Sequence, residues 1–305
     1  MVYNYSLMFS FERHFDPVPS TVWVKANWMH SLTLSVIYIL AVFGGQRLMA
    51  KRPSMGLQGL LTCWNAFLAV FSIAGTIRLT PSFFHTLSND GLLHSMCVMD
   101  FSQTVTGFWT QMFGFSKAIE LLDTVFIVLR KRPLVFLHWY HHVSVLVYTW
   151  HAYKDHTAAG RWFVYMNYVV HACMYTYYAL RSMGYRLPKH LAMALTTMQI
   201  LQMVLGCLVA ATVYYVKLNE ITPCQQTFES LYFSFVIYST YFVLFAHFFY
   251  NTYMKENNKY KMFKLNTART KNEQISPIVK EQNGFSKTII GNGSRFSNGD
   301  AKKER

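Results

Sequence analysis

Three histidines lie close together in one short, apolar part of the chain. His138, His141 and His142 stand at positions i, i+3 and i+4, so a helix brings their side chains to one face within about a turn. A neutral imidazole is suited to proton transfer and to nucleophilic attack near neutral pH. Imidazoles at this spacing can also ligate iron or zinc. The spacing therefore predicts a chemical site of one of these two kinds.

A second group of ionisable residues lies just before the histidines. Lys117, Glu120 and Asp123 follow one another at intervals of three, which places them along one helical face where they partly neutralise each other. An ionisable side chain deep in an apolar span costs roughly 2.5–3.5 kcal/mol on insertion scales, so such residues are candidates for function. For Glu120 and Asp123 the alternative is an internal ion-pair ladder that pins helices together.

Further polar residues lie inside the apolar runs that follow. His171 comes one turn after Asn167, with Tyr177 beyond it, and the next run contains Thr196 and Gln199. Counted from the basic residues that bound each run, these groups lie roughly 10–15 Å inside, at a rise of 1.5 Å per residue. Because Asp123 and His138 lie at a similar depth, the pattern predicts one buried site.

The composition is that of a membrane protein. The 305 residues are 52% hydrophobic and 14% charged, against roughly 25% charged in an average soluble domain. The net charge of +14 could suggest nucleic acid, but its distribution argues against that partner. From Lys255 onward 12 basic and 5 acidic residues leave +7, half of the total, and the other basic residues punctuate apolar runs.

Seven apolar runs are long enough to cross a bilayer, which takes about 20 residues. They are 29–46, 57–77, 107–129, 134–152, 162–180, 191–215 and 227–250. Backbone groups in hydrocarbon must be satisfied within the segment, so all seven are expected to be helices. We predict an all-α polytopic membrane protein whose seven helices enclose the buried site. Its parts are a segment over 1–28, a membrane domain over 29–252 and a disordered basic tail over 253–305.

Basic residues gather after the first, third, fifth and seventh runs, which predicts a luminal N-terminus and a cytosolic C-terminus. Three local features agree with this orientation. Asn4 begins a glycosylation sequon, which is usable only on the luminal side. Cys97 and Cys224 lie in connections predicted to be luminal and could pair there, the alternative being two free thiols. Lys302 and Lys303 resemble a dilysine retrieval signal of the endoplasmic reticulum.

Four motifs in order resemble the very-long-chain fatty acid elongase (ELO) family. Residues 117–124 match KxxExxDT and residues 138–142 match HxxHH. Residues 167–178 match NxxxHxxMYxYY and residues 196–202 match TxxQxxQ. The resemblance covers residues from about 25 to 255. The HWYHH form of the histidine box most resembles the branch that acts on saturated and monounsaturated acyl chains.

The resemblance implies the condensing step of microsomal chain elongation. A long-chain acyl-CoA and malonyl-CoA would give 3-oxoacyl-CoA, CO2 and free CoA. By motif position, His141 would take the acyl group as an acyl-imidazole, with His171 beside it. His138 and His142 would orient the imidazoles or move protons, and Asp123 and Asn167 would support them.

The resemblance also implies the binding partners. The candidate substrate-binding residues are Lys117, Glu120, Arg130, Arg132, Tyr177, Thr196 and Gln199. No metal and no organic cofactor is expected beside the two CoA substrates. The expected surroundings are the bilayer of the endoplasmic reticulum and the reductases and dehydratase of the elongation cycle, with a homo- or hetero-oligomer as a further expectation.

Two other classes of protein compete with this interpretation. A membrane di-iron oxidoreductase carries several histidine boxes, whereas this chain has one box and one remote histidine within a span, which undersupplies a di-iron centre. A transporter or receptor would use the polar cluster as a relay for its substrate.

Overall fold

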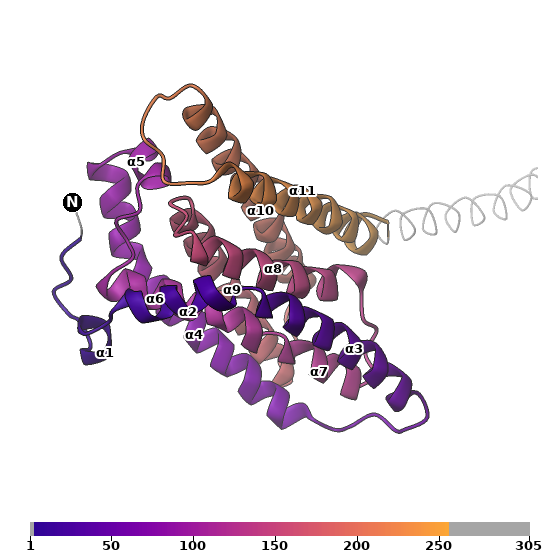
Figure 1. The fold of residues 1–305 in the computed structure, drawn as a ribbon. Coiled ribbons are helices and arrows are strands. Elements are labelled where there is room, and N and C mark those ends of the chain that lie inside the picture. Colours follow the sequence, from indigo (N-terminus) through magenta and orange to yellow (C-terminus); the bar gives the residue numbers. More distant parts are fainter. Residues whose placement is uncertain (1–2, 256–305) are drawn as a thin grey trace, which may run out of the picture. The chain divides into compact units, whose positions relative to one another are not determined.

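The structure, a computed structural model, describes residues 3–255, and this part of the chain is helical without strands (Figure 1). The first six helices are α1 (Ser10–Arg13), α2 (Pro17–Asn27), α3 (His30–Ala50), α4 (Gln58–Asn89), α5 (Leu92–Cys97) and α6 (Thr104–Ile119). The next five are α7 (Leu122–Leu129), α8 (Phe136–Lys154), α9 (Gly160–Ser182), α10 (Lys189–Leu218) and α11 (Phe228–Phe249). A π-helical turn, Tyr250–Met254, follows in a separate unit. The tail from residue 256, with Lys302 and Lys303, lies outside the described residues.

Six of the seven apolar runs are single helices near the predicted positions: α3, α4, α8, α9, α10 and α11. Within the described residues, four helical segments are long and apolar enough to cross a membrane: α3, α4, α10 and the continuous segment Phe228–Met254 that contains α11. The histidine-bearing α8 and α9 are less apolar. The all-α prediction is confirmed, whereas seven spans and the orientation of the termini stay predictions.

The third run, 107–129, is not one helix as predicted but two, α6 and α7, joined by a tight turn. The N–H of Asp123 donates to the carbonyl of Glu120 at 3.0 Å, and the N–H of Thr124 donates to that of Leu121 at 3.3 Å. These bonds reach back three residues rather than four, so they interrupt the α-helical ladder. The interruption falls beside the charged residues of the run.

Helix α4 continues to Asn89, well beyond the predicted end at residue 77. The predicted run ended there because Arg78 brings a charge. The guanidinium of Arg78, however, donates to both carboxylate oxygens of Glu12, a residue with no exposed surface. Burial alone would raise the pKa of Glu12, but the hydrogen bonds from Arg78, Trp109 and a backbone N–H outweigh it and lower that pKa.

Two glycines allow helices to approach tyrosine rings closely. The most extensive contacts between helices join α4 to α9 and α10 to α11. A Cβ at Gly75 of α4 would lie 2.4 Å from the ring of Tyr168 on α9. A Cβ at Gly206 of α10 would lie 2.2 Å from the ring of Tyr238 on α11. Both tyrosines are buried, so glycine is required at these two contacts.

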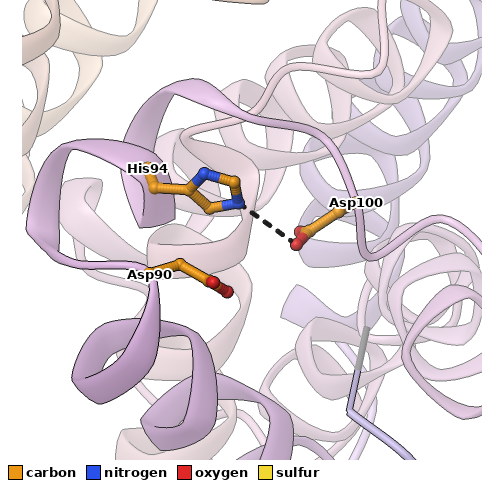
Figure 2. Close-up of side chains that lie close together, drawn as sticks. All are labelled: Asp90, His94 and Asp100. Carbon is orange, nitrogen blue, oxygen red and sulfur yellow. Dashed lines mark hydrogen bonds and ion pairs between the residues drawn. The ribbon is translucent and has the colours of Figure 1, made fainter. Parts of the chain in front are cut away.

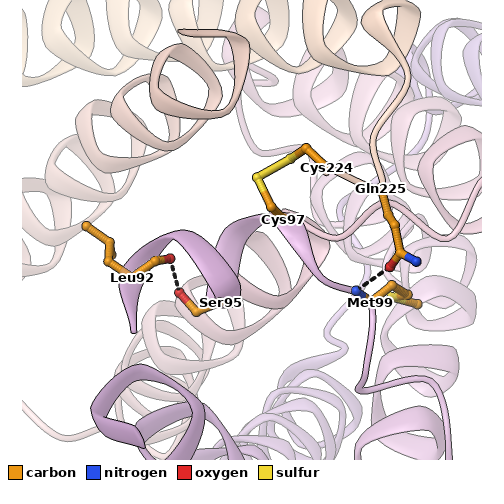
Figure 3. Close-up of a disulfide and its surroundings, with 6 residues drawn as sticks. All are labelled: Leu92, Ser95, Cys97, Met99, Cys224 and Gln225. Atoms are coloured by element: carbon orange, nitrogen blue, oxygen red, sulfur yellow. Dashed lines mark hydrogen bonds between the residues drawn. A yellow bond between two sulfur atoms is a disulfide. The ribbon is translucent and has the colours of Figure 1, made fainter. Parts of the chain in front are cut away.

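A disulfide joins Cys97, at the end of α5, to Cys224, in the segment between α10 and α11 (Figure 3). It is the pairing that we predicted. Two hydrogen bonds reinforce the junction. The side-chain oxygen of Gln225 accepts from the backbone N–H of Met99 at 2.6 Å, and the backbone N–H of Gln225 donates to the Cys97 carbonyl at 2.9 Å. The carbonyl of Gln225 accepts from Ala158, so this segment also holds the start of α9.

Gly75→Ala is expected to destabilise the protein by about 1–3 kcal/mol, because the added methyl overlaps the buried ring of Tyr168. Gly44→Ala on α3 is the matched control, since a Cβ there meets no atom within 4 Å. The measurement is the melting temperature in detergent. Equal melting temperatures for the two variants would show that the α4–α9 contact does not need a glycine.

Candidate active site

The turn between α6 and α7 carries a buried ion pair. The ammonium Nζ of Lys117 lies 2.7 Å from Glu120 Oε1 and 3.0 Å from Asn167 Oδ1 on α9. The hydroxyl of Ser116 donates to the same Glu120 oxygen at 3.0 Å. Lys117 is 1% exposed and Glu120 is 3% exposed. Such a pair is tolerated in an apolar interior only when partners of this kind satisfy both charges.

Glu120 links this pair to His171 on α9. Its second oxygen, Oε2, lies 3.8 Å from Nδ1 of His171 and has no hydrogen-bond donor among the described residues. The ring of His171 contacts Tyr175, with 5.4 Å between ring centroids. The carboxylate therefore stands between an ammonium and an imidazole, where it can stabilise positive charge on either.

The histidine box occupies the first turns of α8 and packs as one group of rings. The centroids of His138 and His142 lie 4.4 Å apart, and those of His141 and His142 lie 5.6 Å apart. His141 lies against Tyr241 of α11 at 4.9 Å. It is also close enough to Lys117 and His171 to interact with them electrostatically. The structure thus gathers the charged cluster, which we define as Lys117, Glu120, His138, His141, His142, Asn167 and His171.

The resemblance implied that Asp123 supports the box histidines, but its hydrogen bonds go to other residues. Its carboxylate accepts hydrogen bonds from the indole N–H of Trp64 on α4 and, at 2.8 Å, from the hydroxyl of Tyr175 on α9. Thr124 takes that place instead, because its hydroxyl lies 2.9 Å from Nε2 of His138. Asn167 likewise contacts Lys117 rather than an imidazole.

The contacts of the other predicted substrate-binding residues follow. Tyr177 packs on Tyr178, and Gln199 donates to the sulfur of Met174 at 3.5 Å. Thr196 is buried and bonds the Ala192 carbonyl of its own helix. At the end of α7, Arg130 donates to Gln58 at 2.6 Å, while Arg132 is exposed.

Sequence reasoning missed several residues that hold the site. Tyr38 of α3 bonds Thr124 at 2.6 Å, and Tyr241 of α11 bonds the hydroxyl of Ser144, two residues after the box, at 2.7 Å. Thr124 is part of the KxxExxDT motif and could have been found there. Trp64, Tyr38 and Tyr241 carry no spacing signal, since their helices have little polar pattern.

An apolar pocket lies between α6, α8 and α9, next to the charged cluster. It is open at one side and is lined by residues that include Phe113, Tyr148, Tyr153, His156 and Phe163. Phe113 joins the two regions, because its ring centroid lies 4.3 Å from Lys117 Nζ. The empty space around these residues, open solvent included, is about 470 Å³.

A separate acidic group could suggest a metal site. Asp90, His94 and Asp100 bring ligand atoms within 4.8 Å of one another, the one such group among the described residues (Figure 2). Asp100 is paired with the buried guanidinium of Arg161 and lies 3.4 Å from His94. The positive charge of Arg161 therefore already neutralises the Asp100 carboxylate. Among the described residues, the histidines of the charged cluster do not bring three ligand atoms this close.

Comparison with known proteins agrees with this geometry. Residues 23–261 match the model of the ELO family, described as GNS1/SUR4 family. The chain belongs to this family. The ELO family match includes the break between α6 and α7, the histidine box and the polar residues of α9.

This ELO family member has close relatives in animals. It is 51% identical over 277 residues to "Putative fatty acid elongase 3" of Caenorhabditis elegans, covering 90% of this chain and 85% of the relative. It is 44% identical over 254 residues to "Very long chain fatty acid elongase 6" of Drosophila melanogaster, covering 82% and 80%. It is 45% identical over 235 residues to "Very long chain fatty acid elongase 3" of Homo sapiens, covering 77% and 86%.

Lys117→Met is expected to destabilise this elongase family member by about 3–5 kcal/mol, because it leaves the Glu120 carboxylate buried without its cation. Adding Glu120→Gln should recover part of the loss. Lys154→Met is the control: Lys154 bonds Asp155 at a partly exposed site, where a pair is worth about 1 kcal/mol or less. The melting temperature in detergent measures all three. Strictly additive losses at Lys117 and Glu120 would contradict the coupling.

Proposed function

We propose that the protein is the condensing enzyme of microsomal fatty acid elongation, a very-long-chain 3-oxoacyl-CoA synthase. The observation that carries the proposal is the charged cluster in an ELO family member, with buried imidazoles beside an apolar pocket. An acyl chain needs an apolar pocket, and its thioester needs a nucleophile protected from water. The relatives' names, fatty acid elongases, agree with this role.

In the proposed first half-reaction, a ring nitrogen of His141 attacks the thioester carbonyl of the acyl-CoA. The C–S bond breaks, the imidazole gives up its N–H proton, and CoA leaves as the thiol with an acyl-imidazole remaining. His142 packs on this ring and His138 packs on His142, so the two pass the proton in turn, and Thr124 fixes the orientation of His138. The pair of Glu120 and His171 balances the positive charge that develops on the attacking imidazole.

In the second half-reaction malonyl-CoA loses CO2, and the enolate that forms attacks the acyl carbonyl. A carbon–carbon bond forms, the bond to His141 breaks, and the imidazole regains a proton from solvent as 3-oxoacyl-CoA leaves. Lys117 is the cation nearest to this chemistry and stabilises the enolate oxygen. No metal and no organic cofactor takes part in this proposal.

The two parts of the substrate would bind at opposite ends of the cluster. Arg130 and Arg132 stand at the end of α7 and suit the anionic CoA head. The acyl chain would extend past Phe113 into the apolar pocket, whose far end limits its length. Tyr177, Thr196 and Gln199 would line the approach. The HWYHH box favours saturated and monounsaturated chains.

We place the enzyme in the membrane of the endoplasmic reticulum, with seven spans, a luminal N-terminus and a cytosolic tail that ends in the retrieval lysines, Lys302 and Lys303. The paired Cys97 and Cys224 support an oxidising lumen on their side. A reductase of the cycle would take up the 3-oxoacyl-CoA, and the dehydratase and the second reductase would act on the products that follow. The enzyme would work as a homo- or hetero-oligomer.

His141→Ala is expected to lower malonyl-CoA-dependent CO2 release from palmitoyl-CoA or stearoyl-CoA by at least about a hundredfold. The assay uses purified protein in detergent, and His94→Ala, outside the site, is the control that keeps its rate. With acyl-CoA alone, the wild type should release at most one CoA per enzyme and His141→Ala none. Unchanged release in His141→Ala would refute the nucleophile, and no CO2 release by folded wild type would refute the enzyme.

The topology predicts a glycan on Asn4, which is exposed in the structure. Wild type made in a glycosylating eukaryotic cell should migrate faster on a gel after endoglycosidase treatment. The migration of Asn4→Gln and of Ser6→Ala should be the same before and after treatment. A wild-type band that the endoglycosidase leaves unshifted would count against a luminal sequon.

A further inference from the structure

Helix α2 packs behind two residues that line the apolar pocket, Tyr153 and His156. Together with Thr157 they form the part of the pocket wall where α8 gives way to the loop before α9. Helix α2 contacts both α6 and α8. It begins at Asp16, whose side chain accepts from the N–H of Val18 at 2.9 Å.

Two adjacent hydroxyls of α2 hold these two residues of the pocket wall. Ser20 Oγ lies 3.1 Å from the hydroxyl of Tyr153, and Thr21 Oγ1 lies 2.8 Å from Nε2 of His156. Each α2 hydroxyl donates its only proton to the carbonyl of Pro17, at 2.9 and 2.8 Å. Tyr153 and His156 are therefore the donors, and both side chains have a fixed direction at the pocket wall.

The wall residues are held in place rather than simply packed. His156 has φ of +47° and is the left-handed residue that follows the C-cap of α8. The N–H of Thr157 donates to the Ala152 carbonyl and that of His156 to the Tyr153 carbonyl, so the backbone of this corner is fixed by the helix cap. Burial lowers the pKa of His156, which keeps the imidazole neutral at pH 7. The bond to Thr21 joins this capped corner to α2.

Helix α2 is itself fixed at both ends. Before it, the buried Glu12 is held by Arg78 and by the indole N–H of Trp109 at 2.8 Å. Toward its end, Val24 is 2% exposed and lies in a small pocket with Gly114 and Trp150. A helix anchored in this way can act as a fixed stop for a chain that fills the pocket.

We propose that Ser20 and Thr21 set the longest acyl chain that the enzyme accepts, by holding Tyr153 and His156 as the end wall of the acyl pocket. This inference rests on the proposed condensing function. A chain that is too long must displace the wall, which the two hydrogen bonds oppose. Without them the side chains can turn aside and admit further carbons.

The test compares condensation rates along the series palmitoyl-, stearoyl-, arachidoyl- and behenoyl-CoA. In Ser20→Ala/Thr21→Val the rate with the first acyl-CoA that the wild type rejects should rise by about tenfold, since one methylene in an apolar pocket is worth that factor. Palmitoyl-CoA should react as in the wild type. Ser88→Ala/Thr62→Val is the matched control, because both hydroxyls bond only backbone carbonyls of their own helix, α4.

Two further variants keep the test decisive if the double variant fails to fold. Tyr153→Phe removes one hydrogen bond with the ring kept, and should shift the limit the same way. Gly160→Ala adds a methyl to the pocket at 3.5 Å from Thr157, an ordinary contact, and should shift the limit to shorter chains.

An unchanged chain-length profile in folded Ser20→Ala/Thr21→Val or Tyr153→Phe, with CO2 release intact, would overturn the role of α2 and leave the condensing function standing. Loss of all chain lengths in equal proportion would also overturn it, because a merely structural role gives that result. No CO2 release by the folded wild type would overturn the condensing function, and this inference with it.

Discussion

The buried ion pair between Lys117 and Glu120 is the constraint around which the rest of the structure is arranged. Two charges removed from water are stable only if every donor and acceptor finds a partner. Ser116 and Asn167 supply partners from α6 and α9, and the turn between α6 and α7 places Glu120 within reach of all of them. A continuous helix would leave the polar residues of this run along a regular face. The break gathers them at one point.

The two carboxylates of this region occupy different environments. Glu120 faces an ammonium and an imidazole and keeps one oxygen without a donor, so it can respond to charge that develops nearby. Asp123 is held on both oxygens by Trp64 and Tyr175, so it fastens α7 to α4 and α9. These two carboxylates, three positions apart, therefore have different roles. Glu120 interacts with charged groups of the site, and Asp123 holds neighbouring helices together.

Much of this could be predicted from residue types, and the failures have physical causes. Apolar run length located six helices, because hydrocarbon leaves the backbone no alternative to helix. The predicted end of the second run was wrong, because the charge of Arg78 is neutralised by Glu12. That residue lies 66 positions earlier, and no local pattern points to it. The box histidines were found because their spacing is helical. Tyr38 and Tyr241, which pack against the box, and Trp64, which holds Asp123, were not found, since each comes from a distant helix through tertiary packing.

The Cys97–Cys224 disulfide gives the molecule a closed covalent ring. Its two ends are 127 residues apart, and every member of the charged cluster lies inside that ring, whereas Tyr38, Trp64 and Tyr241 lie outside it. In the loop-entropy model a ring of this size lowers the conformational entropy of the unfolded chain, which stabilises the folded state by about 5 kcal/mol. The helices that carry the charged cluster would therefore stay covalently linked if α3, α4 or α11 unfolded first. A single cut of the backbone between Cys97 and Cys224 would leave both fragments joined by the disulfide.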